Sequence, residues 1–241
     1  MTEATDSQML VMASAQEYLA AGRVWGTGVW LPPEQREALD WFTLGRLLGW
    51  RCDLAGLETS RLHSVTRNMH RWVVLACDPG EISDDIAAGL GSLLLSPPVM
   101  VILRAGAPGT PASRLGQAIC GTDSIAGRSL RWIHHAGGRT WSLRTSLGGC
   151  HLELKAHSEI WATLDGAPLI VARKIGRGFV VTLAFHPSLA RDTDGSATAL
   201  IRHLLTFGSQ APVAWLDFSN SLILRMDDPG AAQNAYLQCW S

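Results

Sequence analysis

The first half of the chain alternates amphipathic segments with short, unbroken apolar runs. The helical spacing of apolar residues predicts helices over residues 7–21, 32–48 and 84–95. Residues 71–77 and 99–103 are continuous apolar runs, typical of strands that are buried on both faces. Helices that alternate with such strands predict a parallel sheet covered on both sides.

The pattern changes after a helix predicted over residues 112–119. Asp165-Gly166 favours a two-residue hairpin turn, because both positions tolerate a positive φ. We therefore expect an antiparallel meander over 159–185, followed by a last helix over 196–207. Six short segments have strand composition: 128–133, 139–144, 151–155, 159–164, 168–174 and 179–185. The predicted fold class is α/β, a three-layer, mostly parallel sheet with helices on both faces, plus an antiparallel meander in the second half.

Composition narrows the classes of function. The chain has 241 residues and a formal net charge of −1, so no global field favours nucleic acid or acidic lipid. The polar start lacks the pattern of a secretory signal, and the apolar stretch 178–185 is too short to span a bilayer. The five cysteines are widely spaced without a Cys-x-x-Cys pair, which predicts reduced thiols in the cytoplasm. The ten tryptophans are expected in the core rather than on a ligand surface.

A strand followed by a His-Pro pair carries the first family resemblance. The segment 178–188 contains His186-Pro187 and precedes the last predicted helix. Residues 20–208 resemble the class I glutamine amidotransferases, a flavodoxin-like α/β family in which such a strand delivers a catalytic histidine. They also resemble the non-catalytic amidotransferase-like domains attached to some carbohydrate-active enzymes.

That family needs a cysteine at a sharp strand-to-helix turn, a histidine and a carboxylate. By position, Ala105 stands where the nucleophile is expected, and Ser188 stands where the motif carries glutamate. His186 is the one matching member, so the resemblance implies a pseudoenzyme. Cys77, at the end of a predicted strand, is an alternative nucleophile or else an inert thiol.

Two acids near the end carry a second resemblance. The segment 222–230 is similar to the first strand of polysaccharide deacetylase (NodB-like) domains. That resemblance implies Asp227 as general base and Asp228 as a ligand of a divalent metal, completed by histidines of a later segment. The alternative is that both acids are solvated residues of a turn before Pro229.

These observations predict a two-part organisation, an amidotransferase-like domain over 1–210 and a linker with the truncated start of a deacetylase-like domain over 211–241. The expected function is that of a non-catalytic accessory domain of a larger carbohydrate-active protein, with no cofactor and no activity of this chain alone. With the missing domain, the protein would be a metal-dependent deacetylase or hydrolase. A thiol-dependent hydrolase or amidotransferase and a small-molecule or sugar-binding module are the alternatives. The expected partners are a catalytic domain in cis and a carbohydrate ligand, not nucleic acid or membrane, and a homo-oligomer stays open.

Overall fold

A computed structural model describes residues 8–16, 18, 36–48, 50–67, 70–95, 98–116, 118–134, 138–187 and 196–208. The chain divides into two compact units, Met1–Ala211 and Pro212–Ser241. All of the described residues belong to the first unit. Asp227 and Asp228, and with them the expected start of a second domain, lie outside the described residues.

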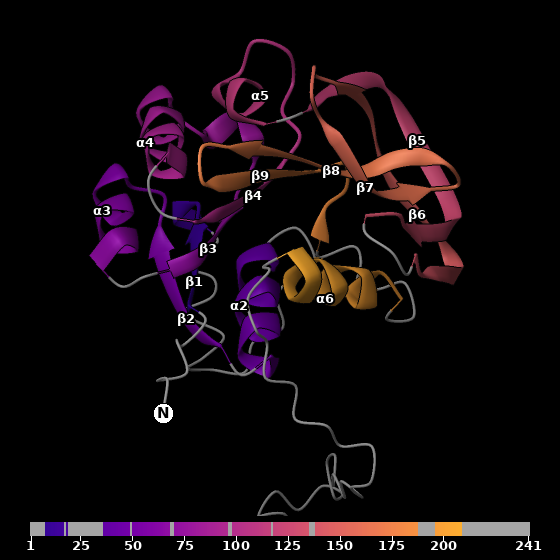
Figure 1. Cartoon of the computed structure of the whole chain (residues 1–241), viewed down its shortest axis with the longest axis horizontal. Helices are drawn as coiled ribbons and strands as arrows, with labels where there is room; N and C mark the ends of the chain where they lie inside the picture. Colours follow the sequence, from indigo (N-terminus) through magenta and orange to yellow (C-terminus); the bar gives the residue numbers. More distant parts are fainter. Residues whose placement is uncertain are drawn as a thin grey trace, which may run out of the picture. The chain divides into compact units, whose positions relative to one another are not determined.

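Helices alternate with strands in the first half of the chain, and strands dominate the second half (Figure 1). The elements are β1 (Gln8–Ala13), α2 (Glu37–Leu47), β2 (Arg51–Gly56), α3 (Thr59–Arg67), β3 (His70–Ala76), the 3-10 helix η2 (Pro79–Glu81), α4 (Asp84–Leu95), β4 (Met100–Arg104), α5 (Pro111–Leu115), β5 (Ala118–Trp132), β6 (Thr140–Leu154), β7 (Glu159–Leu164), β8 (Ala167–Ile175), β9 (Gly178–Leu183) and α6 (Ser196–Gly208).

One nine-stranded mixed sheet has the order β2-β1-β3-β4-β9-β8-β7-β5-β6. The four pairings from β2 to β9 are parallel, and the four pairings from β9 to β6 are antiparallel. The prediction of a three-layer, mostly parallel sheet with helices on both faces is therefore wrong. It generalised from the apolar runs of the first half, whereas the two longest strands, β5 and β6, have 15 residues each and pair antiparallel.

Successive residues of the parallel strands enter two separate cores, because side chains alternate across a strand. In β1, Met9 and Val11 belong to the first core, which includes residues of α2. Leu10 and Met12 belong to the second core, which includes residues of α3 and α4. The side chains of β3 and β4 also alternate between these two cores. The first core continues under β5–β9, where α6 covers it. Both faces of the parallel strands are thus buried against apolar side chains.

Several local predictions fail. The helix predicted over 112–119 ends at Leu115, and β5 begins at Ala118. The predicted helix over 7–21 is wrong at its start, because Gln8–Ala13 is strand β1. A short apolar run fits a helix face and a buried strand equally well. β2 and α3 are missed, since β2 carries Arg51 and Asp53 and α3 has few apolar residues. The predicted segments 128–133, 139–144 and 151–155 are parts of two long strands.

The Asp165-Gly166 turn is confirmed. Asp165 has φ 46° and Gly166 has φ 89°, as a two-residue turn between β7 and β8 requires. The Asp165 carboxylate also accepts hydrogen bonds from the backbone N–H groups of Arg128 (3.1 Å) and Ser129 (2.9 Å). The hairpin turn is thereby fastened to β5.

Candidate functional site: a crevice at the carboxyl ends of the parallel strands

A crevice of about 400 Å³ opens where β3, β4 and β9 end. In parallel α/β sheets, this edge is where ligands bind, because loops rather than helices line it. The lining combines residues that follow these strands with one cysteine from each of β5 and β6. The lining residues are Asp78, Pro79, Gly80, Arg104, Ala105, Ala107, Thr110, Cys120, Cys150, Leu183, Ala184, Phe185 and His186.

A buried carboxylate joins two of the polar groups of the crevice. Glu37, in the first turn of α2, has a side chain that is only 1% exposed. Its Oε2 lies 3.1 Å from Nε of Arg104 and 3.3 Å from Nε2 of His186. Arg104 also donates from Nη2 to the carbonyl of Cys77 at 2.7 Å. A buried carboxylate is stable only with such partners, so the three side chains act as one unit.

Sequence reasoning missed Glu37 as the carboxylate behind His186. The family motif has its acid two residues after the histidine, where this chain has Ser188, a position outside the described residues. The acid instead comes from a helix almost 150 residues earlier in the chain. An acid at the start of an amphipathic helix is usually explained by the helix dipole, so it gives no distinct signal.

Two thiols face the crevice from the β5–β6 ribbon. Cys120 and Cys150 are both partly buried and reduced. Burial, and then a hydrogen bond with the Cys120 thiol, raise the pKa of Cys150 to about 12. Cys120 in turn donates to the carbonyl of Gly121 at 3.6 Å. Cys150 is therefore a protonated thiol at neutral pH, unlike the thiolate of a catalytic cysteine.

The residues singled out from sequence have different environments. His186 lines the crevice and contacts Glu37. Ala105 follows β4 and also lines the crevice, with its N–H bonded to the carbonyl of Leu183 at 2.9 Å. Cys77 is 2% exposed and packs in the second apolar core, with α4, so its thiol lies away from the crevice wall.

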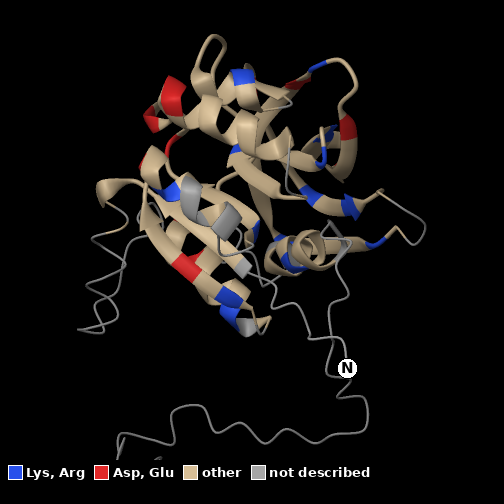
Figure 2. Cartoon of the chain, turned by 60° about the vertical axis from the view of Figure 1, so that its left-hand side comes forward, with Lys and Arg blue, Asp and Glu red and all other residues tan. Residues whose placement is uncertain are grey.

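The charges around the crevice do not favour an anion. Arg104 is balanced by Glu37, and Asp78 adds a carboxylate at the rim. Further exposed acids lie nearby on η2 and α4, and Figure 2 shows red residues at that end of the molecule as well as at other places on its surface. Most Lys and Arg lie elsewhere (Figure 2). The crevice is thus neutral to slightly acidic, which suits an uncharged polar ligand better than a phosphate.

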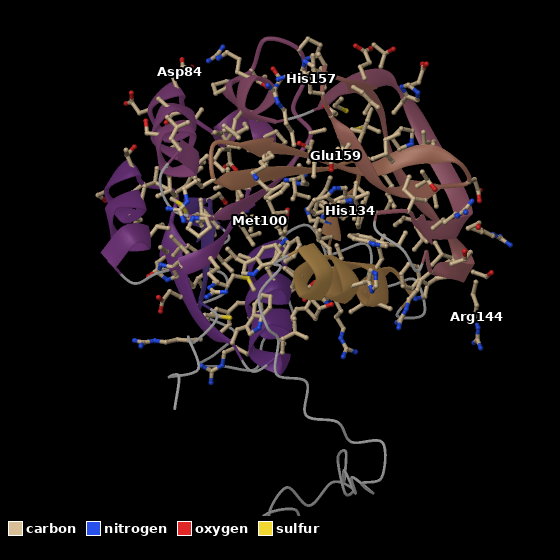
Figure 3. All side chains as sticks on the ribbon, viewed as in Figure 1. Asp84, Met100, His134, Arg144, His157 and Glu159 are labelled. Carbon is tan, nitrogen blue, oxygen red and sulfur yellow. The ribbon has the colours of Figure 1, made fainter. Side chains whose placement is uncertain are left out.

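The tryptophans that the structure describes belong mainly to the core, as predicted. Trp41, Trp72, Trp132 and Trp161 are at most 1% exposed. Trp161 stacks on His134 at 4.4 Å between ring centres, and His134 lies 4.0 Å from Glu159 (labelled in Figure 3). None of the residues that line the crevice is a tryptophan. Ligand stacking on tryptophan is therefore not a property of this site.

Within the described ranges, no group of three or more His, Cys, Asp or Glu side chains is placed to hold a metal ion. The same residues include no helix that is both long and apolar enough to cross a bilayer.

The comparisons with known proteins find solved structures whose fold is similar to that of this chain. No family model matches the chain, and no curated protein matches its sequence. A putative ThuA-like protein from Bacteroides uniformis is 7% identical with a TM-score of 0.55, over 84% of this chain and 91% of that protein. A β-galactosidase from Bacillus circulans sp. alkalophilus is 12% identical with a TM-score of 0.53, over 82% of this chain. An exo-β-1,4-mannosidase from Opitutaceae bacterium strain TAV5 is 12% identical with a TM-score of 0.48, over 80% of this chain.

This chain spans 30% of the galactosidase and 35% of the mannosidase. At these identities the likeness shows the fold alone, and the mannosidase match carries no argument. The mixed α/β sheet is thus a fold that is found both in a protein of similar length and as part of much longer chains.

Proposed function

We propose that this chain is a non-catalytic, amidotransferase-like accessory domain of a larger, cytoplasmic carbohydrate-active protein. The observation that carries the proposal is Ala105, which lines the crevice at the end of β4 where a nucleophile would have to stand. A methyl group cannot attack a substrate. His186 and its carboxylate partner Glu37 then serve to hold the crevice wall together rather than to activate a thiol.

The two crevice thiols support the absence of catalysis. A nucleophilic cysteine needs a lowered pKa, from a nearby cation or a helix N-terminus. The pKa of Cys150 is instead raised to about 12, mainly by burial. A thiol in this state offers almost no thiolate at neutral pH.

The size and charge of the crevice support a role in binding a carbohydrate. A volume of about 400 Å³ suits a small molecule such as a mono- or disaccharide. The balanced charges of Arg104 and Glu37 favour a neutral polar ligand. The same fold forms 30% of a β-galactosidase chain, which fits a domain that accompanies a catalytic domain in cis. For a deacetylase-like partner domain, Asp227 would be the base and Asp228 a ligand of its divalent metal.

Glutamine hydrolysis tests the absence of catalysis. We expect no ammonia release above buffer when the chain is incubated with glutamine. Ammonia release that disappears in Cys77→Ala, Cys120→Ala or Cys150→Ala would overturn the proposal.

Binding in the crevice is tested by calorimetric titration with neutral oligosaccharides. Ala107→Trp fills the crevice from an exposed position without touching the Glu37 cluster, so we expect it to abolish binding. Ala126→Trp, at an exposed position of β5 outside the crevice, is the matched control and should leave binding unchanged. Equal binding by both variants would show that the ligand lies elsewhere.

A thiol-dependent hydrolase is the second candidate, because Cys120 and Cys150 line the same crevice as the His186–Glu37 pair. Iodoacetamide at neutral pH separates the two functions. An activated thiol would be labelled much faster than free cysteine, whereas the raised pKa of Cys150 predicts slower labelling.

A further inference from the structure

Cys120 and Cys150 are neighbouring cysteines of the β5–β6 ribbon. The strand register places them close together, and both residues line the same cavity. Both are partly buried, so a small reagent that enters the crevice can reach them. Cys52 and Cys77 differ, because they are 7% and 2% exposed and lie in two separate apolar cores.

The strand register explains why the thiols meet. Cys120 on β5 pairs with Leu152 on β6, and Cys150 lies two residues from Leu152, on the same face. An irregularity follows at once, since the next paired residue on β5 is Ser124, opposite Cys150. Between these two paired positions, β5 has three residues, whereas β6 has only His151. Such bulges bend a strand and redirect its side chains, here toward one another.

Backbone hydrogen bonds hold both cysteines against the residues that follow β4 and β9. The N–H of Cys120 donates to the carbonyl of Gly106 at 3.0 Å, and the N–H of Cys150 donates to the carbonyl of Ala184 at 2.8 Å. Gly149 approaches the same carbonyl so closely that a Cβ atom there would lie 2.7 Å from it. The backbone of both cysteines is therefore fixed by hydrogen bonds to the residues that follow β4 and β9.

We propose that Cys120 and Cys150 are a redox-active dithiol that a low-molecular-weight disulfide, such as oxidised glutathione, converts into a disulfide across the β5–β6 bulge. One protein thiolate attacks a sulfur of the small disulfide, breaks its S–S bond and releases one small thiol. The second protein thiolate then attacks the protein sulfur of this mixed disulfide and releases the other small thiol. The two protein sulfurs are oxidised, the small disulfide is reduced, and the two protons end on the released thiols.

The disulfide changes the crevice and not only the ribbon. Both cysteines belong to the crevice lining, so joining them fixes the part of the lining contributed by β5 and β6. The inference is independent of the proposed function, because it concerns only the chemistry of the two thiols.

The test uses the full chain and oxidised glutathione at mildly alkaline pH, since the pKa of Cys150 is raised. Remaining thiols are then alkylated, and peptides are identified by mass spectrometry without reduction. We expect a peptide pair linked through Cys120 and Cys150. Cys120→Ser and Cys150→Ser should each lose this link completely and instead accumulate a glutathione mixed disulfide on the remaining crevice cysteine. Cys77→Ser, in the apolar core, should keep the link.

A second probe guards against variants that fold poorly. Phenylarsine oxide bridges two neighbouring thiols and binds a single thiol weakly. We expect one tightly bound equivalent in the unmodified chain and loss of that binding when Cys120 and Cys150 are already oxidised. If the unmodified chain binds no arsenical tightly and yields only mixed disulfides or alkylated Cys120 and Cys150, the dithiol is disproved.

Discussion

The two halves of the sheet bury their strands in different ways. In β3 and β4, almost every residue is buried, because helices cover both faces. In β5 and β6, buried residues recur singly between exposed ones, because only one face of the ribbon meets the core. The parallel half is thus an interior held by apolar contact, whereas the antiparallel half depends on hairpin turns and on register.

The candidate site lies where these two modes meet. β9 pairs in parallel with β4 and antiparallel with β8, and the crevice opens just beyond its end. The parallel half contributes rigid strand ends with Arg104 and His186, and the ribbon contributes two thiols. The polar and thiol side chains of the candidate site therefore lie at the boundary between the parallel and the antiparallel half of the sheet.

The largest difference between the halves should appear in truncated tryptophans. Trp72 on β3 is fully buried and stacks on Trp50, so Trp72→Ala should lower the free energy of unfolding by about 3–5 kcal/mol. Trp141 on β6 is only partly buried, and Trp141→Ala should cost about 1 kcal/mol. Urea unfolding followed by circular dichroism measures both. Equal losses would remove the distinction between the halves.

A smaller effect concerns the buried charge beside the crevice. Glu37→Gln leaves Arg104 without its carboxylate and should destabilise the protein by about 3 kcal/mol. Glu58 is the matched control, because its side chain is 64% exposed and lies 3.8 Å from Arg61. Glu58→Gln should cost less than about 1 kcal/mol. If both variants unfold at the same urea concentration, the Glu37 cluster does not hold the crevice together.

The hairpin of the antiparallel half gives the next effect. Asp165→Ala removes the acceptor of two backbone N–H groups and places alanine at a positive φ, so we expect a loss of about 1–2 kcal/mol. Asp165→Asn keeps an acceptor and tolerates this conformation, so it should lose less. A thermal unfolding scan compares them. An alanine variant as stable as the parent would show that the turn does not fix the register.

The smallest effect is a pH dependence from the aromatic cluster under α6. Burial, and to a lesser degree the charge of Arg139, lower the pKa of His203 from its ordinary value of 6.5. Below pH 6.5, His203 is protonated in the unfolded chain but stays neutral in the folded chain until the pH reaches its lowered pKa. The free energy of unfolding therefore falls as the pH falls from 6.5 to that lowered pKa. His203→Phe should flatten this decline in unfolding experiments at a series of pH values. An unchanged decline would assign the pH dependence to other groups.

The sequence predicts those elements whose pattern of apolar and polar residues matches their burial in the folded protein. β3, β4 and α4 have long apolar or amphipathic runs, and Asp165-Gly166 has turn chemistry of its own. β1 was mistaken for a helix because its partners, β2 and β3, are defined only by tertiary contact. For the same reason, pairing partners cannot be read from β5 and β6.

The candidate site could be predicted only in part. His186 and Ala105 follow strands with a clear pattern, so their places at the sheet edge could be inferred. Glu37 belongs to a distant helix, and the Cys120–Cys150 pair depends on a bulge in the register. The first contact joins segments that are far apart in the sequence, and the second depends on irregular strand pairing. No local sequence pattern encodes either contact.

The position of β9 has a consequence for synthesis on the ribosome. Of the strands that the structure describes, β9 is the last to be made, yet it lies in the middle of the sheet between β4 and β8. Until Gly178–Leu183 has left the exit tunnel, β4 presents a bare row of backbone donors and acceptors to any extended peptide nearby. The nascent protein is therefore most exposed to mispairing and to chaperone capture just before its sheet closes.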